Sequence, residues 1–476
     1  MKYPVLPGLL LSLSACTLVP PLERPAAPLP ARYDDAVVET GNGADLGWRQ
    51  MFTDARLRRL IELSLENNRD LRIATLNVEA VRAQSRIAGA ARLPSVSASG
   101  GVTRQRVPAD VGGASIGVQQ QDTAGIGLSA FEIDLFGRVR AQSEAAFARY
   151  LASGEGRRAA HIALVGAVAD AYFAELLASQ QLQLTASTLA DWRASLEIAR
   201  LLRQARQNSG LDIAQAEGQV ATAEADLEAR RRAVAQARNA LELLVGTAVP
   251  ADLAAAVPLE TQMLPAALPA GLPSDLLTRR PDILQAEQAL RVSNADIGAA
   301  RAAFFPQISL TASLGYASPS MGTLFDGAQR AWSFSPQITQ PLFQGGRLRA
   351  ELDLAKIRHS AAVADYERVI QTAFREVADG LAARATYGQQ IAAQLRTVAS
   401  AERVRELSDL RYRAGQDGRL QLLDAQRNAY AARLVLLELR RDQLRATTAL
   451  YKALGGGYRK GRSAARASVA ETAQIN

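Results

Sequence analysis

Apolar residues recur with a helical 3-4 spacing over two long stretches of the chain, and the two stretches match each other. The first holds ten such positions: Ile213, Ala216, Val220, Ala223, Leu227, Arg230, Val234, Ala237, Leu241 and Leu244. Adding 209 to each number gives the second: Leu422, Ala425, Ala429, Ala432, Leu436, Leu439, Gln443, Ala446, Leu450 and Ala453. A 3-4 spacing sustained this long is typical of a coiled-coil seam. Two matching seams predict an internal duplication.

Other predicted helices also come in pairs. One over residues 70–92 starts at an aspartate and ends before Pro94, and one over residues 282–305 has the same features before Pro306, at a constant offset of 212. An acidic first residue suits the helix dipole, and a proline disfavours helical geometry in the residue before it. The duplication therefore extends well beyond the two seams.

Each of two very long helices reverses in a tight turn into a seam helix. The long helices are predicted over residues 137–207 and 346–414, and the seam helices over residues 211–246 and 419–454. At about 1.5 Å per residue, a long helix extends on the order of 100 Å and a seam helix about 50 Å. The turns are rich in residues that favour tight turns: Asn208, Ser209 and Gly210 in the first, and Gly415, Gln416, Asp417 and Gly418 in the second.

After each helix-ending proline, the hydrophobic period changes to the two-residue period of a strand. The predicted strands cover residues 95–107, 122–134, 307–318 and 331–341, with a phase shift near Phe131. One face of each strand is apolar, and the other carries small and hydroxylated residues. A soluble sandwich would give this alternation, but strands between lipid and water also give it. We favour lipid because the other regular elements are helices too long to wrap a sandwich.

The N-terminus is predicted to be a secretion signal followed by a lipid attachment site. Residues 1–15 contain an apolar run that is too short to span a membrane. The sequence Leu13-Ser14-Ala15-Cys16 resembles a bacterial lipobox, which predicts cleavage before Cys16 and a covalent lipid on that cysteine. By the same resemblance, Thr17 in place of an aspartate favours the outer membrane. An ordinary signal followed by a chance cysteine is the alternative.

The chain is predicted to divide into two repeats with non-repetitive segments around them. The repeats cover residues 51–248 and 274–455, and a linker rich in Pro and Ala covers residues 249–273. Residues 16–50 are expected to form an extended tether because of their prolines. Residues 456–476 lack periodicity and are expected to form a disordered tail.

Composition narrows the class of protein without identifying it. The 476 residues are 48% hydrophobic but only 5% aromatic, which suits long, closely packed helices better than a thick globular core. The net charge of +8 comes mainly from arginines interleaved with acidic residues, a pattern typical of solvated helix faces rather than nucleic-acid binding. The single cysteine excludes an intrachain disulfide.

No catalytic or metal-binding motif is present in the sequence. Its two histidines, His161 and His359, lie inside the predicted long helices, where a structural role is favoured. There is no His-Glu-x-x-His, no Gly-x-Ser-x-Gly, no Walker loop and no pair of cysteines. We therefore predict that the protein is not an enzyme and carries no cofactor apart from the lipid on Cys16.

Four strands in one chain cannot close a membrane barrel, because about eight are needed and open edges are not tolerated in lipid. Strands of this chain in a bilayer must therefore be pooled by several copies. Two copies would leave little lumen, whereas three copies would supply about twelve strands and a channel. A lipid-anchored coiled-coil scaffold that never spans the membrane is the alternative.

These features together resemble one protein family. Besides the lipobox and the duplicated plan, two motifs carry the resemblance: Asp134-Leu135-Phe136-Gly137-Arg138, and Arg411-Tyr412-Arg413-Ala414-Gly415 followed by Leu422-Leu423-Asp424-Ala425-Gln426. Over roughly residues 16–455, the chain is similar to the outer-membrane factor family, the TolC-like exit ducts of tripartite efflux pumps. Within that family it looks like the lipoprotein branch of the OprM/NodT type.

The resemblance implies an internally duplicated α+β membrane protein that assembles as a homotrimer. Its fold would be a twelve-stranded transmembrane β-barrel in the outer membrane, continued by a long periplasmic α-helical coiled-coil barrel. Its partners would be a periplasmic adaptor protein, a proton-driven inner-membrane transporter and outer-membrane lipid, and it would bind no nucleic acid. Its cargo would be small molecules, and an exit duct for secreted proteins is the alternative.

The resemblance also implies a constriction at the periplasmic turns that is shut at rest. Asp417, next to Gln416, is expected to contribute to an acidic ring, in which like charges would raise each other's pKa. Four residues are expected to tether neighbouring helices: Arg411, Tyr412, Arg413 and Asp212. The alternatives are that Asp417 belongs to the chemistry of the turn next to Gly418, and that the other four are solvated or capping residues.

Overall fold

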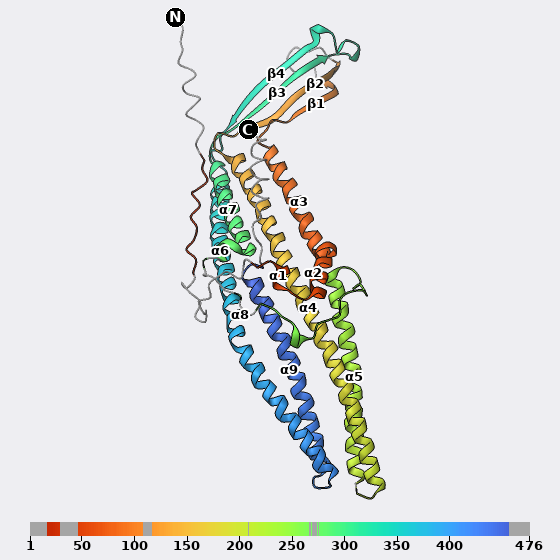
Figure 1. Cartoon of the computed structure of the whole chain (residues 1–476). Coiled ribbons are helices and arrows are strands. Elements are labelled where there is room, and N and C mark those ends of the chain that lie inside the picture. Colours follow the sequence, from red (N-terminus) through yellow and green to blue (C-terminus); the bar gives the residue numbers. More distant parts are fainter. Residues whose placement is uncertain are drawn as a thin grey trace. The chain divides into compact units, whose positions relative to one another are not determined.

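The computed structural model describes residues 17–28, 46–107, 117–207, 209–265, 268, 274 and 276–456. Cys16, Asn208, the signal and residues 457–476 of the expected tail lie outside the described residues. Figure 1 shows the elements: α1 (Trp48–Met51), α2 (Ala55–Asn67), α3 (Arg69–Ala90), β1 (Val96–Val107), β2 (Gly117–Ile133), α4 (Arg138–Gln204), α5 (Gly210–Val245), η2 (Leu259–Thr261), α6 (Leu276–Arg279), α7 (Pro281–Ala302), β3 (Gln307–Ser318), η4 (Met321–Thr323), η5 (Gly327–Gln329), β4 (Arg330–Thr339), α8 (Arg347–Arg413) and α9 (Arg419–Ala453).

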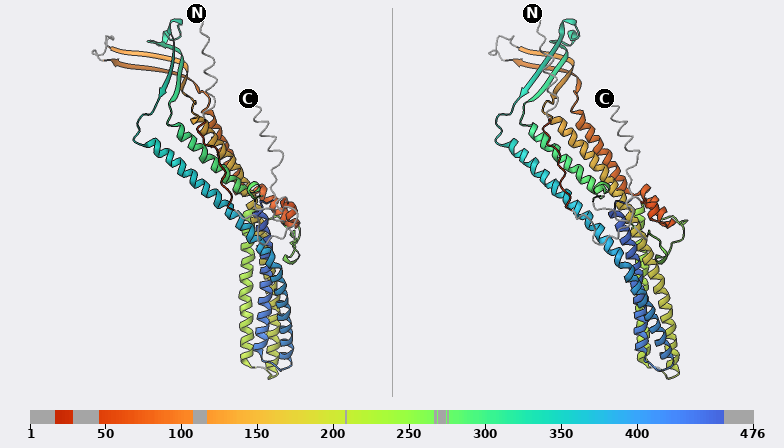
Figure 2. Two further views of the ribbon diagram at one scale, coloured as in Figure 1. Left: turned by 90° about the vertical axis from the view of Figure 1, so that its left-hand side faces the viewer. Right: turned by 60° about the vertical axis from the view of Figure 1, so that its left-hand side comes forward.

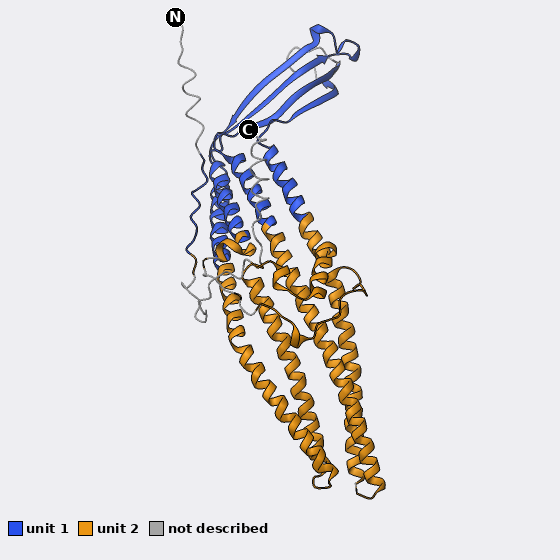
Figure 3. Ribbon diagram, viewed as in Figure 1, with its two compact units in different colours: residues 1–26, 77–154, 285–367 blue, residues 27–76, 155–284, 368–476 orange. Residues whose placement is uncertain are grey.

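The chain forms two compact units that do not coincide with the two sequence repeats (Figure 3). Unit 1 consists of residues 1–26, 77–154 and 285–367, and unit 2 consists of residues 27–76, 155–284 and 368–476. Each unit therefore combines segments from both repeats. The duplication determines the order of helices and strands, whereas compact packing requires elements of both copies.

Unit 1 contains an antiparallel four-stranded sheet in the order β1-β2-β3-β4. The register places Ile126 opposite Leu314, and Leu314 opposite Trp332, so the apolar side chains of neighbouring strands share one face. The other face carries hydroxyl groups, and there the Oγ atoms of Ser313 and Ser333 lie 2.7 Å apart. The alternation predicted from the sequence thus forms one apolar and one hydroxylated face over β3, β4 and the parts of β1 and β2 up to Ala124. Beyond that point, polar residues lie on the apolar side: Asp122, Gln120 and Arg104.

A bulge in β2 keeps the apolar face continuous. The pairing of β2 with β3 shifts register between Leu128 and Phe131, and Ala130 has a left-handed φ of 47°. The extra residues return Phe131 to the apolar face, opposite Leu310. This confirms the phase shift that the sequence predicts near Phe131.

The structure extends one strand beyond its predicted bounds. Strand β2 begins at Gly117, five residues before the predicted start at residue 122. The added residues include Gln119 and Gln121, which pair with Gln105 and Thr103 of β1. Polar residues on both faces hide the two-residue alternation there, although the backbone ladder continues.

Further along β2, Gly125 lies opposite Gly315, and a Cβ atom on Gly315 would lie 2.3 Å from the Ala124 carbonyl oxygen.

The N-terminal segment of unit 1, residues 17–26, lies along α7. Arg301 Nη1 donates to the Leu18 carbonyl at 3.3 Å, and Asn294 Nδ2 donates to the Pro20 carbonyl at 2.8 Å. Arg24 Nη2 lies 2.6 Å from Glu287 Oε1. The described start of the predicted tether is therefore extended and bonded to a helix.

The helices of unit 2 pack along the predicted seams. Figure 2 shows α5, α9 and the unit 2 parts of α4 and α8 side by side. Ala216, Val220 and Ala223 of the first seam are buried against Leu189, Trp192 and Leu196 of α4. In the second seam, seven of the ten predicted positions are buried: Leu422, Ala425, Ala429, Ala432, Leu436, Leu450 and Ala453. The 3-4 pattern is thus confirmed as the packing surface of both helices.

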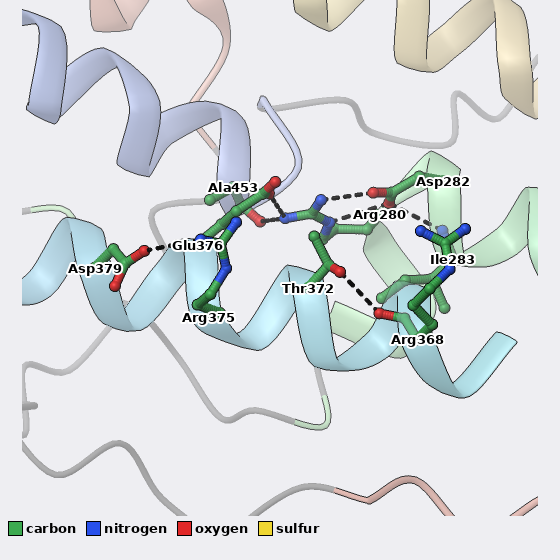
Figure 4. A network of polar contacts seen from close by, with 9 residues as sticks. All are labelled: Arg280, Asp282, Ile283, Arg368, Thr372, Arg375, Glu376, Asp379 and Ala453. Atoms are coloured by element: carbon green, nitrogen blue, oxygen red, sulfur yellow. Dashed lines mark hydrogen bonds and ion pairs between the residues drawn. The ribbon is translucent and has the colours of Figure 1, made fainter. Parts of the chain in front are cut away.

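Arg280 joins three helices of unit 2 (Figure 4). Its Nε and Nη2 atoms lie 3.0 and 2.5 Å from the two carboxylate oxygens of Asp282, at the start of α7. Its Nη1 donates to Glu376 Oε2 of α8 at 2.8 Å and to the Ala453 carbonyl of α9 at 3.0 Å. The Arg280 side chain is only 9% exposed, so these contacts satisfy a charge that is largely removed from water.

We expect Arg280→Met to lower the free energy of unfolding by about 2 kcal/mol. The loss stays below that of a fully buried pair because the side chains of Asp282 and Glu376 remain 39% and 41% exposed. The control is Arg375→Met on α8, the helix of Glu376, where the arginine is 70% exposed and lies 3.8 Å from Asp379. Urea unfolding in detergent, followed by circular dichroism, measures both variants. Equal losses in the two variants would contradict the role of Arg280.

Candidate functional site at the helical tip and on the sheet

Two turns of unit 2 form what we call the helical tip: residues 205–207 and 209, between α4 and α5, and residues 414–418, between α8 and α9. In the second turn, Gly415 has a φ of 69°, and the Gln416 N–H donates to the Arg411 carbonyl at 2.9 Å. This is a Schellman motif, in which a left-handed residue satisfies the last carbonyls of the helix. Glycine suits that position because it lacks a Cβ atom.

The first turn has the same geometry with a different residue in the left-handed position. Arg206, 209 positions before Gly415, has a φ of 61°, and the Gln207 N–H donates to the Leu202 carbonyl at 2.8 Å. Gly210 is the first residue of α5, and Gly418 is the N-cap of α9 with a φ of −75°. Of the glycines expected in the turns, only Gly415 is therefore needed for a left-handed backbone.

Asp417 is paired with Arg411 across the second turn. Arg411 Nε and Nη2 lie 2.6 and 2.8 Å from Asp417 Oδ2 and Oδ1. The hydrogen bonds from Arg411 hold the pKa of Asp417 below its ordinary value, so the side chain is a carboxylate at neutral pH. In the single chain, Asp417 is therefore half of an ion pair with Arg411.

The other expected tethers also find partners within their own hairpins. Asp212 accepts from the Ser209 N–H at 2.8 Å and from Ser209 Oγ at 2.6 Å, while the Asp212 N–H donates to Ser209 Oγ. This reciprocal pair is a capping box at the start of α5. Arg413 Nε lies 2.9 Å from Asp409, one turn earlier on α8. Gln416 is exposed, and Tyr412 is buried. Capping and local pairing thus account for Asp212 and Arg413 in the single chain.

Sequence reasoning missed Arg419, which links the two hairpins. Arg419 is the first residue of α9 and is 2% exposed, and its Nη1 donates to Ser195 Oγ of α4 at 2.7 Å. Its guanidinium carbon also lies 5.2 Å from the centre of the Tyr412 ring. A signal was available, because a basic residue in the first turn opposes the helix dipole and needs another reason to be there.

The sheet presents an apolar face and two open edges. Among the described strands, β1 pairs only with β2, and β4 pairs only with β3. The large apolar side chains on one face are exposed: Val96, Val102, Val118, Ile126, Ile133, Leu314, Trp332, Phe334 and Ile338. A contiguous exposed apolar face marks a surface that contacts lipid or protein, and an open edge can accept another strand.

A family model described as "Outer membrane efflux protein" matches residues 60–247 and 272–456. The chain belongs to this family. The antibiotic efflux pump outer membrane protein ArpC and the toluene efflux pump outer membrane protein TtgC, both of Pseudomonas putida, are each 47% identical to it over 454 residues, which cover 94% of this chain and 93% of theirs. The open-state crystal structure of the Neisseria gonorrhoeae MtrE outer membrane channel matches with a TM-score of 0.84 and 39% identity, covering 93% of this chain and 98% of that one.

The efflux protein is the exit duct of a tripartite pump and lies in the outer membrane. A tripartite pump implies an adaptor and an inner-membrane transporter as partners. Members of this family are transport ducts rather than enzymes. The fold matches that of solved outer-membrane channels, with mostly helical structure and a four-stranded sheet.

The two histidines of the efflux protein lie in the long helices, His161 in α4 and His359 in α8. Within the described ranges, no group of three or more His, Cys, Asp or Glu side chains is placed to hold a metal ion. Burial, and then the charge of Arg157, lowers the pKa of His161. His359 Nδ1 lies 3.1 Å from Ser293 Oγ.

Proposed function

We propose that three copies of the efflux protein pool their sheets into one closed barrel of about twelve strands in the outer membrane. The open edges of β1 and β4 support this assembly, because lipid offers no partners for their backbone groups. The apolar face faces lipid, and the hydroxylated face lines water. The helices continue the barrel as an α-helical coiled-coil conduit in the periplasm. A scaffold that never spans the membrane leaves the apolar face without a use.

The assembled conduit is passive, and its cargo consists of small molecules supplied by a proton-driven inner-membrane transporter. The relatives support a range of small molecules, because the proteins named for antibiotic and toluene efflux are equally similar to this chain. In the described residues, the pore-facing surface of the sheet carries mainly hydroxyl, amide and small side chains, and it includes a pocket lined by Thr103, Gln105 and Gln121. We assign selection of the cargo to the transporter, which supplies it.

The helical tip is the gate of this conduit. A resting duct must be shut, and the tip holds charged side chains at the ends of four helices. Asp417 of each copy, paired with Arg411, contributes an ion pair to the mouth. Such a ring attracts cations through its carboxylates, while the arginines limit the repulsion among them.

Cys16 carries the lipid anchor. Residues 17–26 support this assignment, because they begin directly after Cys16 and are bonded to α7 near its end at Ala302. An acylated Cys16 would tie the chain to the outer membrane.

The conduit is tested with protein purified from outer membranes in mild detergent. We expect a trimer by light scattering that dissociates on heating, and discrete conductance steps in planar lipid bilayers. Both follow from the need of the β1 and β4 edges for partners. A monomer that passes no ions would overturn the proposal. Association with outer membranes that resists urea but forms no channel would instead favour the scaffold.

The anchor is tested by mass spectrometry of the mature N-terminal peptide. We expect Cys16 at the new N-terminus with acyl chains on its thiol and amine, and loss of the acyl mass in Cys16→Ser. Cys16 is the only cysteine in the chain, so a thioester signal has one possible origin. A mature chain that starts elsewhere, or carries no acyl mass, would refute the assignment.

The gate is tested with Asp417→Ala. Loss of the carboxylate leaves Arg411 unpaired at the mouth, so we expect a higher single-channel conductance at rest and a weaker preference for cations. Asp424→Ala is the matched control, because Asp424 is 59% exposed and lies 3.9 Å from Arg427 of its own helix. Unchanged conductance and unchanged ion preference in Asp417→Ala would remove this residue from the gate.

A further inference from the structure

Arg419 is a buried charged residue at the helical tip that has no role in the gate as proposed above. Its side chain donates to Ser195 Oγ, hydrogen-bonds with the Tyr412 side chain and lies near the Tyr412 ring, but its Nε atom is buried without a hydrogen-bond partner in the described structure. No ion pair to Arg419 occurs within the described residues, since the nearby carboxylates of Asp212 and Asp409 act on it only electrostatically. A buried charge that is partly satisfied is kept only where its position matters.

The contacts of Arg419 come from two other helices. Ser195 belongs to α4 of the first hairpin, and Tyr412 belongs to α8. In contrast, Arg411 pairs with Asp417 inside the second turn, and Asp212 caps its own helix inside the first turn. Of these charged groups at the tip, Arg419 is the one whose hydrogen bond crosses from the second hairpin to the first.

Further polar contacts attach α9 to the first hairpin. Gln219 Nε2 of α5 donates to Gln426 Oε1 at 3.2 Å, and both side chains are buried. The hydroxyl groups of Tyr430 and Thr185 lie 2.7 Å apart, and Gln181 Nε2 donates to Glu438 Oε1 at 3.3 Å. Together with Arg419 and Ser195, these contacts form a polar ladder that fixes the register of α9 against α4 and α5. Arg419 is the rung nearest the turn.

We propose that Arg419 is a latch that holds the α8–α9 turn against α4 in the closed gate and is released on opening. The proposal deepens the gate function proposed above and rests on it. Release is physically accessible because the guanidinium is incompletely bonded when buried, and water satisfies all its N–H groups when it is exposed. The hydrogen bond between Arg419 and Ser195 therefore fixes one geometry of the closed tip but can still be broken on opening.

The test compares Arg419→Ala, Ser195→Ala and their double variant in planar bilayers. We expect Arg419→Ala to raise the resting leak about tenfold, the effect of losing one charge-assisted hydrogen bond on a two-state gate. Ser195→Ala should raise it less, and the double variant should match Arg419→Ala. The control is Arg427→Ala, because Arg427 is 57% exposed on the same helix and lies 3.9 Å from Asp424, so its leak should equal that of the wild type.

Amide hydrogen exchange gives a second readout that needs no channel activity. Ser195→Ala keeps Arg419 and changes one small side chain, so it carries the test if Arg419→Ala does not fold. In both single variants, exchange at residues 419–423 should be faster than in Arg427→Ala. Wild-type leak and exchange in the single variants, or additive effects in the double variant, would overturn the latch. A wild-type protein that conducts nothing would instead refute the proposed conduit.

Discussion

The need to satisfy backbone hydrogen bonds in lipid governs the rest of this molecule. The outer edges of β1 and β4 expose N–H and C=O groups that water can bond and hydrocarbon cannot. The same strands carry an apolar face that suits lipid and is poorly suited to water, with Trp332 77% exposed in the single chain. In a monomer, the unpaired edges favour water while the apolar face favours lipid. In a closed ring the edges are paired, so the apolar face can contact lipid. The proposed assembly therefore rests on the backbone groups of the β1 and β4 edges rather than on any particular contact between side chains.

At the tip, most charged side chains pair with a residue of the same turn rather than with another hairpin. Arg411 with Asp417, and Ser209 with Asp212, satisfy each other within a turn. Such short-range pairs preserve the form of each turn whether or not the hairpins are docked. Contacts between the hairpins rest instead on the polar ladder of α9, of which Arg419 is one rung. This division allows a turn to move as a unit, because its own hydrogen bonds travel with it.

The sequence predicted the elements well because their signals are periodic. The seams, the strands and the bulge near Phe131 all appear as regular patterns or interruptions of them. The start of β2 could not be predicted, since Gln119 to Gln121 are polar on both faces. Nor could the pairing of Arg411 with Asp417, because a bond across six residues depends on the turn that Gly415 creates. Arg419 was missed because burial of an arginine depends on helices distant in the sequence.

The duplicated turns have diverged in the way their second helices begin. The start of α5 is self-sufficient, because Ser209 and Asp212 form a capping box there. The strain of Arg206 falls at the end of α4 and does not weaken that start. In contrast, α9 begins at Gly418, which has no side chain to cap the helix, and its first residue is a cation facing the positive end of the helix dipole. The first turn of α9 thus depends on Ser195 and Tyr412 for its order. Ordering of the first turn of α9 and docking of the second hairpin are therefore coupled, whereas the first turn of α5 is capped by residues of its own hairpin.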